Sequence, residues 1–282
     1  ITLRLSDKDL KASREDGYGP EWPIDYSELS PHYSALEKRL KVHGELDQLK
    51  NLPDGEFLSP LPFTKSEQRF ANNLKNAFQF PFIHSRGFGP HNHNKQNPWP
   101  PSSSPGSTLQ SAIATGNVEI LTDHIAERII VNKDRESASG VLVVNQQDGS
   151  RKEIKSSLIV LCASTIQSLR ILLNSESNQH QNGFIDPSGL LGSNLMDHIS
   201  ICRFFAFPKI KGSSNNLEPM TLSGAGSFFI PFGANLEKTF KPNFLRGYGI
   251  WGGIDRFDPP NILKKIPDSS IGFLIGHGEV LP

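Results

Sequence analysis

The stretch "LIVLCASTIQSLRILLNS", residues 158–175, decides how the fold of this chain is interpreted. Its first five residues are apolar, which favours a strand buried on both faces, with Cys162 as a small buried hydrophobe. After Ala163-Ser164 the period changes, and apolar residues recur at helical spacing: Ile166, Leu169, Leu172 and Leu173. The stretch therefore predicts a buried strand, a tight turn and a helix.

The turn at Ala163-Ser164 is a candidate ligand site. In nucleotide-binding α/β folds, the ligand lies beyond the carboxyl end of a strand and near the N-terminus of the following helix. The small side chains of Ala163 and Ser164 would let a ligand approach the backbone there. An ordinary strand-to-helix turn explains the stretch equally well, because the glycines of a dinucleotide fingerprint are missing.

Strand signals precede this stretch. Three short runs rich in Val and Ile favour strands: residues 118–121, 126–132 and 139–145. Asp148-Gly149 predicts a tight hairpin turn after the third run, because glycine supplies the positive φ that such a turn requires. We therefore expect three antiparallel strands ahead of the buried strand that ends at Ala163.

The flanking regions carry further signals. Ser30 as N-cap, Pro31 at the first helical position and Gly44 beyond the end predict a helix near 31–42 with Tyr33, Leu36 and Leu40 on its apolar face. Frequent prolines between residues 52 and 105 predict loop-rich covering structure, interrupted by a helix around 65–78. A short helix is expected before Gly116, and Phe- and Gly-rich runs beyond residue 200 favour strands of a second sheet.

Composition excludes several classes of protein. Lysine plus arginine total 29 and aspartate plus glutamate total 29, so no net charge favours nucleic acid. No apolar run is long enough to cross a membrane, and the two cysteines, Cys162 and Cys202, do not suggest a disulfide framework. Because the chain begins with Ile1 and ends at "GEVLP", we expect it to be an interior piece of a longer protein.

Several blocks carry a family resemblance. In order they are "GYGPEWPIDYSELSPHYSALE", "GSTLQSAIATGNVEILTDHIAERIIV", "SGVLVV", "IVLCASTIQSLRILLNS", "SGLLGSNLMDH" and "LRGYGIWGG". Together they resemble the glucose-methanol-choline oxidoreductases, which oxidise alcohols with FAD. The resemblance implies a mixed α/β fold: part of a Rossmann-like FAD-binding domain with a β-meander (106–200), and a substrate domain with an antiparallel sheet (1–105 and 201–282).

The resemblance also implies cofactor-binding residues. The residue that matches Ala126 binds the adenine of FAD through its backbone N–H and C=O, so alanine should serve as well as the usual valine. The family's second signature begins with Gly-Ala or Gly-Ser, where this chain has Ser164-Thr165, and its usual Ser-Pro is Ser168-Leu169. We therefore predict flavin contacts at Ala163 and Ser164, with altered local geometry.

Other parts of the family pattern are missing. The only GxGxxG string, residues 247–252, is followed by "GIDRFDPP" rather than a helix, so we interpret it as a strand of the substrate domain. The resemblance places the FAD pyrophosphate loop before Ile1 and the catalytic histidine beyond Pro282. No catalytic residue is predicted in this chain. Asp197 and His198 in "NLMDH" are interpreted as structural partners at a domain seam.

Two further constellations favour structural interpretations. His84, His91 and His93 could suggest a metal site, but without nearby acidic residues or cysteine we expect a solvated loop. Trp251, Phe228, Phe229 and Phe232 are expected in the core rather than in a substrate pocket.

The leading hypothesis is an FAD-dependent alcohol or sugar dehydrogenase or oxidase with an unknown electron acceptor. The alternatives are an inactive relic that keeps the fold and, less supported, a nicotinamide-dependent dehydrogenase, whose fingerprint is missing.

Overall fold

The computed structural model describes residues 2–91, 94–96, 98–132, 137–175, 186, 188–209, 224–232, 246 and 248–280. The chain divides into two compact units: unit 1 comprises Ile1–Gly116 and Met196–Pro282, and unit 2 comprises Asn117–Leu195. Helices accompany antiparallel sheets in both units, so the fold class is mixed α/β. No helix within the described ranges is long and apolar enough to cross a membrane. The assignment of 1–105, 106–200 and 201–282 to substrate and FAD-binding domains stays a prediction.

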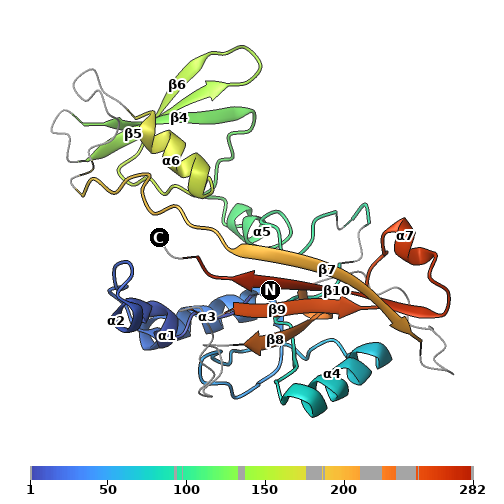
Figure 1. Ribbon diagram of the computed structural model, residues 1–282. Helices are drawn as coiled ribbons and strands as arrows, with labels where there is room; N and C mark the ends of the chain where they lie inside the picture. Colours follow the sequence, from blue (N-terminus) through green and yellow to red (C-terminus); the bar gives the residue numbers. More distant parts are fainter. Residues whose placement is uncertain are drawn as a thin grey trace. The chain divides into compact units, whose positions relative to one another are not determined.

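Unit 1 is built on a five-stranded antiparallel sheet (Figure 1). Its strands, in spatial order, are β2 (Ile83–His84), β8 (Phe228–Phe232), β9 (Tyr248–Ile254), β10 (Ser269–Gly278) and β7 (Ile199–Pro208). The Phe- and Gly-rich runs therefore form strands of a second sheet, as predicted. The GxGxxG string contributes most of β9 and opens no helix, which confirms that it is not a dinucleotide loop.

Smaller elements complete unit 1. They are α1 (Asp7–Leu10), α2 (Ala12–Asp16), α3 (Tyr26–Leu40), β1 (Val42–His43), α4 (Lys65–Phe78), β3 (Gly87–Phe88), α5 (Thr108–Ile113), the 3-10 turn Gly224–Gly226 and α7 (Asn261–Lys264). Strands β1 and β3 pair with each other. The predicted helix at 65–78 is confirmed as α4, and the short helix before Gly116 is confirmed as α5.

One face of the large sheet is buried by phenylalanines. Phe228, Ile230 and Ile254 form the core of a cluster that Phe70 and Leu74 of α4 cover. Phe229, on the opposite face, packs with Leu52 and Ile83 in a second cluster. The expectation that Phe228 and Phe229 belong to the core is confirmed, since their exposed fractions are 0% and 4%.

The start of α3 differs from the prediction. Asp25 is the N-cap, and its capping box with Glu28 starts the helix at Tyr26, so Pro31 lies inside it. The physical reason is that Asp25 and Glu28 satisfy N–H groups reciprocally, which Ser30 does not do here. The predicted apolar face is also wrong in part: Leu36 is 51% exposed, whereas Glu37 is buried.

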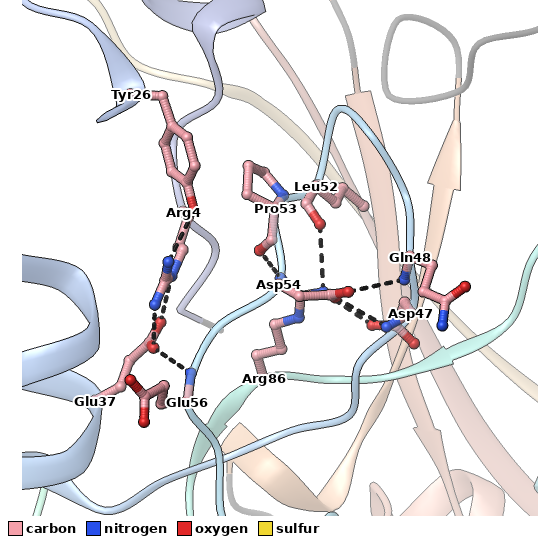
Figure 2. A network of polar contacts seen from close by, with 10 residues as sticks. All are labelled: Arg4, Tyr26, Glu37, Asp47, Gln48, Leu52, Pro53, Asp54, Glu56 and Arg86. Atoms are coloured by element: carbon pink, nitrogen blue, oxygen red, sulfur yellow. Dashed lines mark hydrogen bonds and ion pairs between the residues drawn. The ribbon is translucent and has the colours of Figure 1, made fainter. Parts of the chain in front are cut away.

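A buried arginine, Arg4, explains why Glu37 lies inside, and a second one, Arg86, pairs with two aspartates (Figure 2). Arg4 donates from Nε and Nη2 to the two carboxylate oxygens of Glu37, at 2.8 and 2.6 Å. Arg86 donates to Asp47 and Asp54 at 3.0 and 2.9 Å. These charge-assisted pairs fasten the loop-rich segments of unit 1, where few regular hydrogen bonds exist.

A third pair ties α4 to the large sheet. The guanidinium of Arg256 donates from Nε and Nη2 to the carboxylate of Glu67, both at 2.7 Å, and both side chains are at most 1% exposed. The same carboxylate accepts from the N–H of Ile254 in β9 at 3.1 Å. Glu67 also closes the capping box of α4 with Thr64. One buried glutamate thus starts the helix and joins it to the sheet.

The described part of unit 2 contains a three-stranded antiparallel meander and one helix. The strands β4 (His124–Val131), β5 (Ala138–Asn145) and β6 (Arg151–Lys155) pair in sequence order. The hairpin turn is confirmed, with Gly149 at φ 71°. The expectation of a first strand at 118–121 is wrong: those residues have no strand partner, and the third strand of the meander is β6.

The predicted buried strand at 158–162 is not formed. Leu158 and Val160 are 77% and 73% exposed, and Cys162 is exposed as well. A strand requires a neighbouring strand to accept its hydrogen bonds, and none of the described segments supplies one here. The helix that follows, α6 (Thr165–Leu173), is confirmed. Its buried residue is Ile171, however, rather than one of the four apolar residues that the spacing indicated.

Candidate cofactor-binding site

The strand-to-helix turn has an unusual backbone. Ser164 is the N-cap of α6 with φ 70° and ψ 165°, a region that essentially only glycine adopts without strain. Its side chain makes no capping hydrogen bond. Ala163 and Ser164 are both exposed. The position at which the resemblance implies glycine therefore has the backbone conformation that glycine favours.

Helix α6 is held against β4 by Ser175. The Ser175 hydroxyl, 3% exposed as a residue, accepts from the N–H of Ile129 at 2.8 Å and donates to the carbonyl of Ile171 at 2.5 Å. Because β4 is an edge strand, its outward-facing backbone N–H groups have no neighbouring strand to accept them. The Ser175 hydroxyl supplies the acceptor for one of these groups, the N–H of Ile129. This hydrogen bond ties the C-terminal end of α6 to the meander.

Ala126 lies on the same edge strand. It is half-buried, pairs with Val143, and is followed by a register shift before Arg128. Such a bulge bends a strand and redirects its backbone groups. Glu127, at the bulge, accepts a bidentate interaction from Arg151 at 2.9 and 3.1 Å, which lowers the pKa of its carboxyl.

These features fit a ligand that contacts backbone. Small, exposed residues at 163–164 leave room for a ligand, and the first N–H groups of α6 receive no side-chain cap from Ser164. The helix N-terminus favours electronegative groups. A shallow hollow of about 530 Å³ in unit 2 is lined by other residues, among them Ser139, Lys155 and Ser156. The three predicted residues lie on β4 and at the start of α6, and their binding role stays a prediction.

The remaining candidates have structural partners or stay untested. Nδ1 of His84 lies 2.7 Å from a carboxylate oxygen of Glu45, and the imidazole ring stacks on Phe63. His93 lies outside the described residues. Asp197 and His198 are exposed, and the backbone N–H of His198 donates to the Asp197 carboxylate at 2.7 Å. Within the ranges given above, no group of three His, Cys, Asp or Glu side chains is arranged for a metal ion.

One polar cluster was missed by the sequence analysis. Ser200, Trp251 and His277 come together on one face of the large sheet through hydrogen bonds of 2.7 and 2.9 Å. Only Trp251 was considered, and it was expected in the core; it is half-buried and packs against the core cluster of Leu52, Ile83 and Phe229. The available signal was the alternation in β10, which places His277 on the same face as Ile275 and Phe273.

Comparison with known proteins gives the class of protein. A family model described as GMC oxidoreductase matches residues 19–200, more than half of the chain. The chain therefore belongs to the GMC oxidoreductase family, and the resemblance drawn from its sequence blocks is confirmed.

A curated relative adds detail. The chain is 27% identical over 195 residues to a protein named 2-methyl-1,2-propanediol dehydrogenase from Mycolicibacterium austroafricanum. The match covers 64% of this chain and 35% of the relative. The chain thus spans about a third of the length of that relative.

Proposed function

We propose that this chain is an internal part of an FAD-dependent oxidoreductase that oxidises CH–OH groups of alcohols or sugars. The observation that supports it most is the family match over 19–200, which includes the meander, its bulge and the turn at Ser164. The relative named as a dehydrogenase of a small diol makes a small alcohol the preferred substrate over a sugar.

Unit 2 would contribute to the cofactor site. In this proposal it is part of a Rossmann-like FAD-binding domain, in which the backbone of Ala126 contacts the adenine. Ala163 and Ser164 let the cofactor approach the start of α6. Bound FAD supplies the hydride acceptor for the carbinol carbon. The residues of unit 2 bind and orient the cofactor, and the large sheet of unit 1 belongs to the substrate domain.

The test measures whether bulk added at Ala163 removes bound flavin from the protein. In the longer protein that contains this chain, Ala163→Leu adds bulk where the flavin is proposed to lie, and Ser157→Leu adds similar bulk at an exposed position of the same segment. We expect the first variant to lose bound flavin and the second to keep it. Addition of alcohols without oxygen should bleach the flavin absorbance of the wild-type protein.

Two results would contradict the proposal. If both leucine variants retained flavin equally, the site would lie elsewhere in the molecule. If the wild-type protein bound flavin but no alcohol or sugar bleached it, the inactive-relic hypothesis would replace the enzyme.

A further inference from the structure

Strand β7 forms one edge of the large sheet in unit 1. Among the strands that the structure describes, it pairs with β10 alone, and Figure 1 shows it at the margin of that sheet. Its register with β10 continues over all ten residues of the strand without a bulge. Every residue of β7 is exposed except Phe205 and Phe207, which are half-buried. The strand is therefore long, regular and open on one side.

The backbone hydrogen bonds define which groups of β7 face the open side. Just beyond the strand, the N–H of Lys209 donates to the carbonyl of Asp268 at 2.8 Å, so residue 209 faces β10. Because the direction of backbone groups alternates along a strand, the odd-numbered residues of β7 also face β10 and the even-numbered ones face outward. The carbonyl of Pro208 agrees with this, since it accepts from the Arg69 side chain at 3.3 Å.

The outward N–H groups of β7 have no acceptor among the described residues. They belong to Ser200, Cys202, Phe204 and Ala206. Pro208, the other outward residue, has no N–H to donate. Water can satisfy these groups on an open edge, but so can the carbonyls of a further strand.

The other sheet edges of this chain have features that prevent pairing, and β7 does not. In β6, the edge of the meander, four of the five residues are charged. Strand β2 has only two residues, and β4 has a bulge and the contact with Ser175. The only charged residue of β7 is Arg203, and its proline stands at the last position. Since charge, proline, bulges and short length keep edges apart, β7 is the edge that is open to pairing.

The side chains along β7 are apolar on both faces. Ile199 and Ile201 are 70% and 53% exposed on one face, and Phe204 is 49% exposed on the other. A further strand would satisfy the outward N–H groups and cover this apolar surface at the same time. A strand that fits here therefore carries apolar side chains on both of its faces.

We propose that the open side of β7 pairs with an apolar strand of the longer polypeptide that contains this chain. The inference rests on the proposed function, in which the chain is an internal part of a larger oxidoreductase. The match covers only 35% of the curated relative, so a protein of that length has enough further chain to supply the strand.

A second copy of the chain fits this edge less well. A two-fold antiparallel pairing that uses every outward N–H joins position 200 to 206 and position 202 to 204. It places Arg203 directly opposite its own equivalent. Like charges directly opposite each other destabilise a strand pair.

Amide hydrogen exchange in the longer protein, resolved to single residues, tests the pairing. The inward amides of Ile201, Arg203 and Phe205 are the internal control, because β10 accepts them in either case. We expect the outward amides to be protected as well. On an unpaired edge the outward amides would exchange faster than the inward ones, by about 100-fold or more. Such an alternation would overturn the inference.

Photo-cross-linking identifies the strand that pairs. Phe204 is replaced by the photo-reactive analogue p-benzoylphenylalanine in the longer protein, and the cross-linked peptides are sequenced by mass spectrometry. The same analogue at Glu153, on the charged edge β6, measures non-specific capture. We expect Phe204 to capture a peptide of the same molecule outside these 282 residues.

Three results would overturn the inference: capture of a peptide within residues 1–282, capture of a second molecule, or capture no greater than at Glu153. A pairing with a second copy would also lose its amide protection on dilution. Flavin content and alcohol-dependent bleaching test the proposed function separately. The pairing can therefore fail while the proposed function stands.

Discussion

Replacing Ser164 with glycine should stabilise the packing of α6 on the meander. Ser164 has φ 70° and ψ 165°, and a non-glycine residue in this region stores about 1–3 kcal/mol of strain. Glycine releases that strain but loses more backbone entropy on folding, about 0.5–1 kcal/mol. The expected net gain is therefore about 0.5–2 kcal/mol.

Hydrogen exchange at the Ile129 amide is the suitable assay. This N–H donates to Ser175 at the far end of α6, so it exchanges when the helix separates from β4. The three tryptophans, Trp22, Trp99 and Trp251, all lie in unit 1, so tryptophan fluorescence does not report directly on this event. A gain of about 0.5–2 kcal/mol should slow exchange by about 2- to 30-fold.

Ser157→Gly is the matched control, because Ser157 is exposed in the same segment and does not have a positive φ. Glycine there should leave exchange unchanged or make it faster, since only the entropic cost remains. If Ser164→Gly exchanged no more slowly than wild type, the turn would not be strained. The reasoning that connects this position to the family's glycine would then be wrong.

The remaining predictions concern buried polar contacts. Glu67→Gln should lower the free energy of unfolding by about 3–5 kcal/mol in urea titrations, because Arg256 would keep a buried charge without its carboxylate; the exposed Glu153→Gln should cost almost nothing. Ser175→Ala should cost about 1–3 kcal/mol, because it leaves a buried N–H without an acceptor, and should speed exchange at Ile129. The hydrogen bond from Arg246 lowers the pKa of Asp16 below 3.8, so the stability this pair contributes is complete above that pH and is lost as the pH falls through the lowered value. An acid titration in which Asp16→Asn lost stability as steeply as wild type below pH 3.8 would contradict the last prediction.

Local signals in the sequence predicted several elements correctly. A helix was expected around 65–78 and α4 spans Lys65–Phe78, and the hairpin turn followed from Asp148-Gly149. The helix after Ser164 followed from the change of period at that residue. Each of these features depends on residues within a few positions of one another, which is why a single sequence sufficed.

Features that depend on distant partners were not predictable. Glu37 is buried because Arg4, remote in sequence, pairs with it, and the apolar face assigned to α3 missed this. The segment 158–162 has the composition of a buried strand, yet its environment is set by neighbours that composition cannot specify. The polar cluster at Ser200 joins three strands, so the alternation within β10 alone did not identify it.

The candidate cofactor-binding residues were predictable in part from the sequence. Ala126, Ala163 and Ser164 came from a family resemblance, and the structure places them on one unit, on an edge strand and at a glycine-like turn. The composition of the turn indicated a close approach to backbone. It did not indicate the positive φ of Ser164, because serine rarely adopts that conformation.

The most direct test of flavin dependence is the flavin content of the longer protein that we propose contains this chain. The protein is purified and desalted, and its visible absorbance spectrum is recorded beside that of the 282-residue chain alone. We expect a yellow longer protein with a flavin spectrum and a colourless isolated chain. A colourless longer protein that stays colourless after incubation with FAD would contradict the claim that this chain belongs to a flavin-dependent enzyme.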